Sequence, residues 1–395
     1  MRILNVFNNY LEPGGEANAV SMITASLAET VELRRCDFSS ADWSGAGSPA
    51  KWRQALWMIE NPSSVRRLQR LEASLRSDAW LVHNVFPVGS AAVYRQAERL
   101  GIPVIQYLHN YRPLSVNGYL WANERLLDGQ PIANYLAEIR HGAWQTSHAK
   151  SAWFAFVLTL LRATGWQRRS VKAWIAISEF VRQKFIEAGV PAADVFTLRH
   201  YWKPRPPAAA GDDAHYLFLG RLIEAKGVNV LLDAWEILEK QHGSKTPRLI
   251  VAGDGPLRAA VAERAERSRS VHFAGSIAGA YKEEALRNAK AVIVPSTWWE
   301  PLGLVVYEAY DFSRPVLAAR SGGLAETVAH GETGFVHEPG NAAELAAHVL
   351  ELESDANSRQ RMGAGGREWL LRNVGEADWR QRFQEIARYA TRPAA

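Results

Sequence analysis

The chain has 395 residues, of which 47% are hydrophobic and 22% charged, a length that suits two domains and a composition ordinary for globular proteins. Its single cysteine, Cys36, excludes a disulfide framework and a cysteine-rich metal site, and it fits a reducing cytoplasm. The net charge of +5 is uneven, with +8 over residues 1–205 and −3 over the rest. The basic half faces either an anionic surface or only solvent, and both interpretations remain open.

Strand-length apolar runs alternate with helical patterns along the first half of the chain. The first run begins almost at the initiator methionine and is interpreted as a strand, not as a signal peptide. We expect strands at residues 3–7, 31–36, 79–85, 104–108, 174–177 and 196–198. The uncharged stretch 151–161 is too short to span a bilayer. The aromatic, amphipathic segment 153–166 lies either at a membrane interface or packed on the sheet, and packing is favoured.

The second half repeats the alternation after a boundary rich in proline and alanine at residues 203–213. We expect strands at residues 216–219, 249–252, 271–273, 292–294 and 316–318. Strands that alternate with helices predict parallel sheets with helices on both faces. The fold class is therefore α/β, with two Rossmann-like domains at about residues 1–205 and 206–375, and a helical tail after Gly365.

The segment from Trp298 to Glu308 is the most informative stretch. It follows an apolar strand and carries two carboxylates, Glu300 and Glu308, on either side of a Pro/Gly loop that leads into a helix. A helix N-terminus is a natural site for a phosphate, because its free N–H groups and dipole point at the same spot. Carboxylates that flank such a site are suited to accept hydrogen bonds from sugar hydroxyls. The pattern indicates a nucleotide-sugar.

The ordered set of motifs closely resembles the retaining glycosyltransferases of family 4, which have the GT-B fold. Beside Glu300-x7-Glu308, the resemblance rests on several segments in the family's order, over about residues 1–350: Pro13-Gly14-Gly15, His83-Asn84, Leu108-His109-Asn110-Tyr111-Arg112, Gly220-Arg221 with Lys226-Gly227, Gly253-Asp254-Gly255, Phe273-Ala274-Gly275, Ser321-Gly322-Gly323 and His330-Gly331. It implies two sheets facing each other across a cleft, with a last helix (about 376–395) that returns to the first domain.

The resemblance also implies roles in the second domain. Arg221 and Lys226 hold the donor diphosphate and stabilise it as a leaving group, since cations at the carboxyl edge of a parallel sheet sit where such sheets bind ligands. Glu300 accepts from the transferred sugar, and Glu308 accepts from the ribose. Three backbone N–H groups, those of Leu302, Gly303 and Leu304, meet the diphosphate or the sugar. Ile277 meets the nucleobase.

In the first domain, Gly14 and Gly15 allow close approach of the backbone to a phosphate or sugar, and the resemblance places His109 against the donor sugar. The catalytic set is thus expected to be Glu300, His109, Arg221 and Lys226. His83, Asn84 and Arg112 are candidates for the acceptor side. The chain departs from the family at His200, where relatives tend to carry Asn. This difference concerns the acceptor side or the hinge, and not the donor site.

These features predict a metal-independent, retaining glycosyltransferase that uses a nucleoside diphosphate-sugar and needs no cofactor. The expected acceptor is a glycolipid or surface polysaccharide at the inner face of the cytoplasmic membrane. Alternatives are a small natural-product acceptor, a sugar-nucleotide epimerase of the same architecture, and a non-catalytic binding module. An oxidoreductase is disfavoured because no Gly-x-Gly-x-x-Gly follows the first strand. No nucleic-acid recognition module is visible. Base, sugar, acceptor and oligomeric state are not fixed by the sequence.

Overall fold

The computed structural model describes residues 1–11, 14–123, 125–127, 133–206 and 211–392, which form two compact units. Unit 1 comprises Met1–Ala122, Leu127–His200 and Glu376–Ala395, and unit 2 comprises Asn123–Leu126 and Tyr201–Gly375. Pro13 and part of the expected boundary, residues 207–210, lie outside the described residues. Each unit is an α/β layer structure around its own parallel sheet, so the expected fold class is confirmed.

The sheet of unit 1 has the strand order β2-β1-β3-β4-β7-β8, and all of its neighbours are parallel. The strands are β1 (Arg2–Asn9), β2 (Glu32–Ser39), β3 (Ala79–Val82), β4 (Val104–Leu108), β7 (Val171–Ala176) and β8 (Val195–Thr197). All six expected strands are present, the one at residues 104–108 with the expected bounds and the other five with ends shifted by up to three residues. The strand β3 ends at Val82, three residues before the expected end, because the chain turns out of the sheet at His83.

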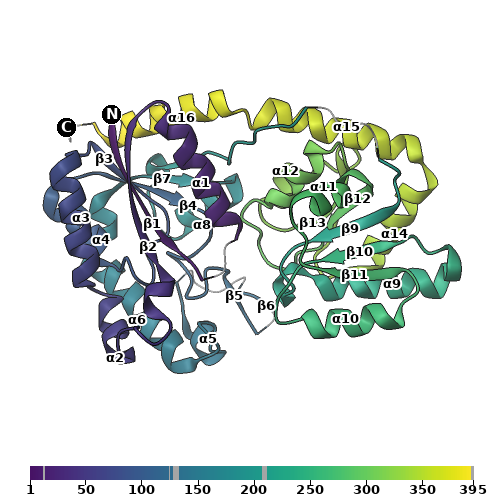
Figure 1. The fold of residues 1–395 in the computed structure, drawn as a ribbon, viewed down its shortest axis with the longest axis horizontal. Coiled ribbons are helices and arrows are strands. Elements are labelled where there is room, and N and C mark those ends of the chain that lie inside the picture. The colour runs from purple at the N-terminus through teal and green to yellow at the C-terminus, as the bar shows by residue number, and fades with distance from the viewer. Residues whose placement is uncertain (12–13, 124, 128–132, 207–210, 393–395) are drawn as a thin grey trace. The chain divides into compact units, whose positions relative to one another are not determined.

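Helices cover both faces of this sheet. They are α1 (Gly15–Ala28), α2 (Lys51–Trp57), α3 (Pro62–Leu75), α4 (Ala92–Leu100), α5 (Leu136–Arg140), α6 (His148–Thr164), α7 (Trp166–Ser170), α8 (Glu179–Glu187) and α16 (Glu376–Ala390). The last helix, yellow in Figure 1, packs against α1, β4 and β7. It belongs to unit 1 although all of unit 2 precedes it in the chain.

Local sequence explains where several of these helices begin and end. Asn61 caps α3 by accepting from the N–H of Ser63, and Pro62 occupies the first helical position, where a missing N–H does no harm. The helix α6 ends at Gly165 in the left-handed region, which glycine adopts without strain. This helix buries Phe154, Leu158 and Leu161, so the expected packing of segment 153–166 is observed on one face.

The sheet of unit 2 has the order β11-β10-β9-β12-β13-β14, again all parallel. Its strands are β9 (His215–Leu219), β10 (Leu249–Ala252), β11 (Val271–Gly275), β12 (Ala289–Val294), β13 (Val316–Ala319) and β14 (Gly334–His337). The five expected strands are present. The edge strand β14 was missed, because four residues after a Gly-rich turn give little periodicity.

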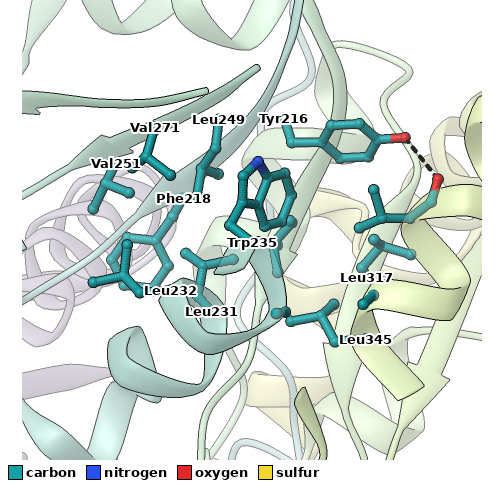
Figure 2. Close-up of a cluster of buried hydrophobic side chains, with 14 of the residues drawn as sticks. Tyr216, Phe218, Leu231, Leu232, Trp235, Leu249, Val251, Val271, Leu317 and Leu345 are labelled. Carbon is teal, nitrogen blue, oxygen red and sulfur yellow. Dashed lines mark hydrogen bonds between the residues drawn. The ribbon is translucent and has the colours of Figure 1, made fainter. Parts of the chain in front are cut away.

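The helices of unit 2 complete the layers. They are α9 (Val228–His242), α10 (Arg258–Arg267), α11 (Gly279–Arg287), α12 (Leu304–Asp311), α13 (Leu324–Thr327), α14 (Ala342–Ser354) and α15 (Ala356–Asn373). Figure 2 shows the core between the sheet and helices α9 and α14, with Trp235 at its centre. The Tyr216 hydroxyl, buried in this core, has two acceptors within hydrogen-bond distance, the carbonyl oxygen of Val349 at 3.2 Å and Oε1 of Glu353 at 2.9 Å, as a buried polar group requires.

Both sheets have a switch point, where the strand order reverses. It lies between β9 and β12 in unit 2 and between β1 and β3 in unit 1. Loops that leave neighbouring strands in opposite directions separate there, so ligands of open α/β sheets bind beyond the carboxyl ends at this place. Most of the site residues expected from the sequence lie in or next to the loops at these two points.

Candidate functional site

The loops after β9 and β12 are joined to each other at the switch point of unit 2. The N–H groups of Thr297 and Trp298 both donate to the carbonyl of Ala225, at 3.0 and 3.3 Å. Gly227 has a φ of +71°, and a Cβ there would lie 1.8 Å from the carbonyl oxygen of Pro295. Only glycine permits this approach. The Lys226-Gly227 motif thus has a structural reason, which is to bring Lys226 up to the second loop.

Lys226 and Glu300 form an ion pair at this junction, between Nζ and Oε1. The same carboxylate oxygen accepts a hydrogen bond of 2.8 Å from the Ser296 hydroxyl. Glu300 is only 4% exposed, whereas the Lys226 side chain keeps 22% of its surface. The indole ring of Trp298 lies 5.2 Å from Lys226 Nζ and adds a cation–π contact. A buried carboxylate held by a cation and a hydroxyl is oriented before any ligand arrives.

The loop after β13 fixes the backbone of Glu300. The N–H of Gly323 donates to the Glu300 carbonyl at 2.7 Å, and Gly322 has a φ of +58° with space for no side chain, since its Cβ would lie 2.3 Å from that carbonyl oxygen. The expected Ser321-Gly322-Gly323 motif therefore supports Glu300 from behind. Three loops from three neighbouring strands therefore converge on Glu300.

The N-terminus of α12 opens beside Glu300. Gly303 precedes the helix with a φ of +83°, and the side chain of Leu302 is buried. The first N–H groups of a helix have no partner within it, so the backbone at Leu302, Gly303 and Leu304 offers donors to an anion. One turn into the helix, partly buried Glu308 pairs with Lys282 of α11 at 2.7 Å. Lys282 was not expected from the sequence.

Arg221 is exposed where the chain leaves β9. Its loop is braced by the Gly253-Asp254-Gly255 turn, because the N–H of Leu222 donates to the carbonyl of Asp254 at 2.8 Å. A Cβ on Gly253 would lie 1.8 Å from the carbonyl oxygen of Gly220, so this turn also requires glycine. The motif thus positions the segment that carries Arg221. Ile277, which follows β11, is half-buried between that strand and α11.

Histidines occupy the corresponding edge in unit 1. His83 follows β3 and is 2% exposed, and His109 follows β4. Nδ1 of His83 lies 2.8 Å from Nε2 of His109, and Nε2 of His83 lies 2.8 Å from Oδ1 of Asn5. Burial lowers the pKa of His83 to about 3 and holds that of His109 well below its usual value. Both rings are therefore neutral at physiological pH.

These rings also stack on two others. His109 lies 4.9 Å from Tyr107 and 5.2 Å from His200, measured between ring centroids, and burial lowers the pKa of His200 to about 3. His200, the position at which the chain departs from the family, thus contacts the ring of His109. Asn84, by contrast, closes a local turn through both ends of its amide, which bond the N–H and the carbonyl of Phe86.

A pocket within unit 1 is lined by His83, His109, Asn110, Arg112 and Glu16, among other residues. The half-buried Glu16 accepts from Asn110 at 2.9 Å. Desolvation in this pocket raises the pKa of Glu16 to about 7, against the opposing effect of Arg112. The Arg112 guanidinium lies 4.7 Å from the Trp144 ring and donates to the carbonyl of Val116. Some of its N–H groups are therefore used within unit 1 and are not available to a ligand.

Gly14 and Gly15 are the N-cap and the first residue of α1, directly before Glu16. Gly14 has extended backbone, and a Cβ on it would meet nothing within 4 Å. The structure of unit 1 therefore does not itself require glycine at position 14. The space that a side chain would fill is open to a ligand, which is compatible with the expected close approach.

Several residues at these two edges were not predicted. Ser296 and Lys282 carry no motif, and their contacts depend on the pairing of distant loops. Glu16 could have been predicted from the sequence, because it is an acidic residue directly after Gly14-Gly15 at a switch point, where ligands bind. Asn5 was expected only as part of the first strand. Within the described residues, no group of three or more His, Cys, Asp and Glu is arranged to hold a metal.

Two family models match the chain almost end to end. The model described as "Glycosyl transferase 4-like domain" matches residues 17–200, and the one described as "Glycosyl transferases group 1" matches residues 203–369. Among solved structures, the Anabaena protein HepE in complex with UDP superposes with a TM-score of 0.67 at 17% identity, covering 98% of this chain and 99% of that one. Sucrose-phosphate synthase from Thermosynechococcus elongatus reaches 0.73 at 17%, with 98% of both chains.

Curated relatives are similar in sequence over parts of the chain. A Mycobacterium tuberculosis glycogen synthase is 32% identical over 169 residues, 42% of this chain and 39% of that protein, so the chain spans well under half of its length. The alpha-D-kanosaminyltransferase of Streptomyces kanamyceticus is 26% identical over 78% of this chain and 74% of its own. Motif order, fold and family models agree: the chain belongs to the group 1 glycosyl transferases, the GT4-type glycosyltransferases with the GT-B fold.

Proposed function

We propose that the protein transfers a sugar from a nucleoside diphosphate-sugar to an acceptor, with retention of the anomeric configuration and without a metal ion. One observation carries the proposal. At the switch point of unit 2, buried Glu300 is held by Lys226 and Ser296 beside the glycine-capped N-terminus of α12. This arrangement offers a cation and backbone donors to a diphosphate, and a fixed carboxylate to a sugar.

Each residue takes the role that the family resemblance implies for its motif. Arg221 and Lys226 neutralise the charge that develops on the departing diphosphate, a contribution of several kcal/mol to lowering the barrier. Glu300 accepts hydrogen bonds from hydroxyls of the sugar, and Glu308 accepts from the ribose in competition with Lys282. The backbone at residues 302–304 contacts the diphosphate, and Ile277 packs on the base. His109 contacts the transferred sugar, as the family resemblance implies.

The donor class is also supported by structural neighbours. HepE has been solved in complex with UDP and with UDP-glucose, at 17% identity in each case. Metal-independent transfer is supported by the cations of the chain itself, since Arg221 and Lys226 at one sheet edge can take the place of a divalent ion in balancing the diphosphate.

For the acceptor, we propose a glycolipid or surface polysaccharide at the inner face of the cytoplasmic membrane, with the protein cytoplasmic and peripheral. An exposed apolar patch on α2 and α6 supports membrane contact: Trp52, Leu56 and Phe156 are 62, 52 and 49% exposed. The Trp153 indole of α6 donates to the carbonyl of Ala55 in α2 at 3.0 Å, and the two helices lie side by side (Figure 1). Lys51 and Arg53 flank Trp52, as expected for an anionic surface.

Relatives point to two acceptor classes. The lipopolysaccharide core glycosyltransferase LpsD of Rhizobium meliloti, 26% identical over 67% of this chain, supports the membrane version. The kanosaminyltransferase supports a small soluble acceptor instead. No helix of the described residues is long and apolar enough to cross a membrane. Sedimentation with phosphatidylglycerol vesicles separates the two: salt-sensitive binding that Trp52→Ser with Phe156→Ser abolishes supports the membrane acceptor, and no binding contradicts it.

The transfer itself is tested with a panel of nucleoside diphosphate-sugars in the presence of EDTA. We expect release of one nucleoside diphosphate and an α-linked product from an α-linked donor. Glu300→Gln should reduce the rate at least about 100-fold. Glu353→Gln is the matched control, because Glu353 sits in a comparable part-buried pair with Lys290 elsewhere in unit 2. An undiminished rate in Glu300→Gln, or release of a free epimerised sugar without acceptor product, would overturn the proposal.

A further inference from the structure

A continuous line of hydrogen bonds runs from helix α1 through β1 and β3 to His109. The Thr24 hydroxyl donates to the carbonyl of Val20 at 2.6 Å, and the Asn5 amide nitrogen donates to the same hydroxyl at 2.9 Å. The Asn5 oxygen faces Nε2 of His83, and Nδ1 of His83 faces Nε2 of His109, both at 2.8 Å. The direction of every bond follows from the first one.

The direction is fixed at Thr24. A hydroxyl has one hydrogen, and here it is used on Val20, so the oxygen can only accept from Asn5. The Asn5 NH2 must then point to Thr24, which leaves its carbonyl oxygen toward His83. An amide oxygen only accepts, so Nε2 of His83 carries the proton.

The protonation of the two rings extends this direction to His109. A neutral imidazole has one N–H, and His83 uses it on Asn5, so its Nδ1 is a bare acceptor. Burial lowers the pKa of both rings, which keeps them neutral. Nε2 of His109 must therefore donate to His83. The opposite tautomer would set two lone pairs against each other at 2.8 Å.

Nδ1 of His109 is left as a bare acceptor. It is buried, and no donor among the described residues lies within hydrogen-bond distance. The ring plane is held by stacking on Tyr107 and His200, at 4.9 and 5.2 Å. A buried polar atom without a partner is destabilising, and a ligand that supplies the missing donor gains the full hydrogen bond. The pocket lined by His109 and His83 is the space from which such a donor can come.

We propose that Asn5 and His83 are positioning residues that hold His109 in its Nε2–H tautomer, so that Nδ1 accepts a hydrogen bond from a hydroxyl of the transferred sugar. This rests on the proposed function for the identity of the ligand. It also assigns a specificity. A hydroxyl that can donate is accepted, whereas a carboxylate, a fluorine or a hydrogen at that position leaves Nδ1 unpaired.

The tautomer is measured directly by NMR of protein labelled with ¹⁵N at histidine, using long-range couplings between the ring nitrogens and carbon-bound protons. We expect His109 to show the Nε2–H pattern in the wild type. His83→Phe removes the acceptor and should give a mixture of tautomers. His200→Phe is the matched control, because His200 lies as close to His109 as His83 does but forms no hydrogen bond with it.

An Nδ1–H pattern for His109 in the wild type would overturn the proposal, even if His83→Phe did not fold. An unchanged pattern in a folded His83→Phe would overturn it as well. The sugar hydroxyl is tested separately with deoxy and uronic acid analogues of the accepted donor, for which kcat/KM should fall about 10-fold or more at one ring position only. An equal response at all positions would contradict the assigned hydroxyl. Failure of every nucleotide to bind would overturn the proposed function, which the tautomer does not measure.

Discussion

The two units share one architecture, but one presents charged groups at its switch point and the other presents neutral ones. Both carry a six-stranded parallel sheet whose order reverses between two central strands. At that point unit 2 places an ion pair, Lys226 with Glu300, whereas unit 1 places neutral imidazoles hydrogen-bonded to an amide. Charge in unit 2 suits a diphosphate and its leaving group. Neutral, directed hydrogen bonds in unit 1 suit hydroxyls.

The difference also shows in how the edges are built. In unit 2 the loops meet through glycines: Gly227, Gly253 and Gly322 each have a backbone carbonyl within 2.3 Å of where a Cβ would lie. In unit 1 the edge is held by side chains, through Asn5, His83 and stacked rings. The comparison predicts that unit 2 is sensitive to side-chain size at glycine positions, and unit 1 to the protonation of its histidines.

The largest expected effect is that of Gly227→Ala. Its methyl group would lie 1.8 Å from the carbonyl oxygen of Pro295, so the two loops must separate. We expect unit 2 to lose about 4 kcal/mol or more. Gly101→Ala in unit 1 is the matched control, with a similar φ of +67° but open space, and should lose about 1 kcal/mol. Scanning calorimetry resolves the two, and equal losses would show that strain in φ, not loop contact, dominates.

A smaller effect is expected on the stability of unit 1 as the pH falls. The pKa of His200 is lowered to about 3 by burial, so between about pH 6.5 and 3 the unfolded chain binds a proton that the folded unit 1 does not. Stability therefore falls as pH drops through this window, by about 2 kcal/mol at pH 5 for one such histidine. His200→Phe should remove this part of the loss between pH 7.5 and 5. Urea unfolding at both pH values tests it, with exposed His141→Gln as control, and an unchanged pH dependence contradicts it.

The smallest effect distinguishes the contribution of ribose binding from that of diphosphate binding in unit 2. Glu308→Gln should weaken binding of the accepted nucleoside diphosphate about 10-fold, because a carboxylate is a stronger acceptor than an amide. The 2′,3′-dideoxy analogue should bind equally to the variant and the wild type. An equal loss for both ligands would mean that Glu308 acts on the phosphates through Lys282, with which it forms an ion pair.

How far the sequence predicts this molecule depends on the range of the contact. Apolar runs predicted eleven of the twelve strands in the two large sheets, because burial on both faces makes such runs continuous. The family resemblance predicted the motif residues, and three of the motif glycines, Gly227, Gly253 and Gly322, have a local steric reason in the structure. The direct pairing of Lys226 with Glu300, 74 residues later, was not predicted, since it requires both loops in place. The line from Asn5 to His109 needs three strands in register, which no local pattern encodes.

The central claim is that the switch point of unit 2 binds a nucleoside diphosphate, and calorimetric titration tests it most directly. UDP, GDP, ADP and CDP are titrated into the wild type, Arg221→Ala and, as a control, Arg264→Ala, whose side chain pairs with Asp233 on the surface of the same unit. We expect one nucleotide to bind the wild type and the control alike, and Arg221→Ala to bind it at least about 10-fold more weakly. Binding by none, or equal binding by all three proteins, would contradict the account.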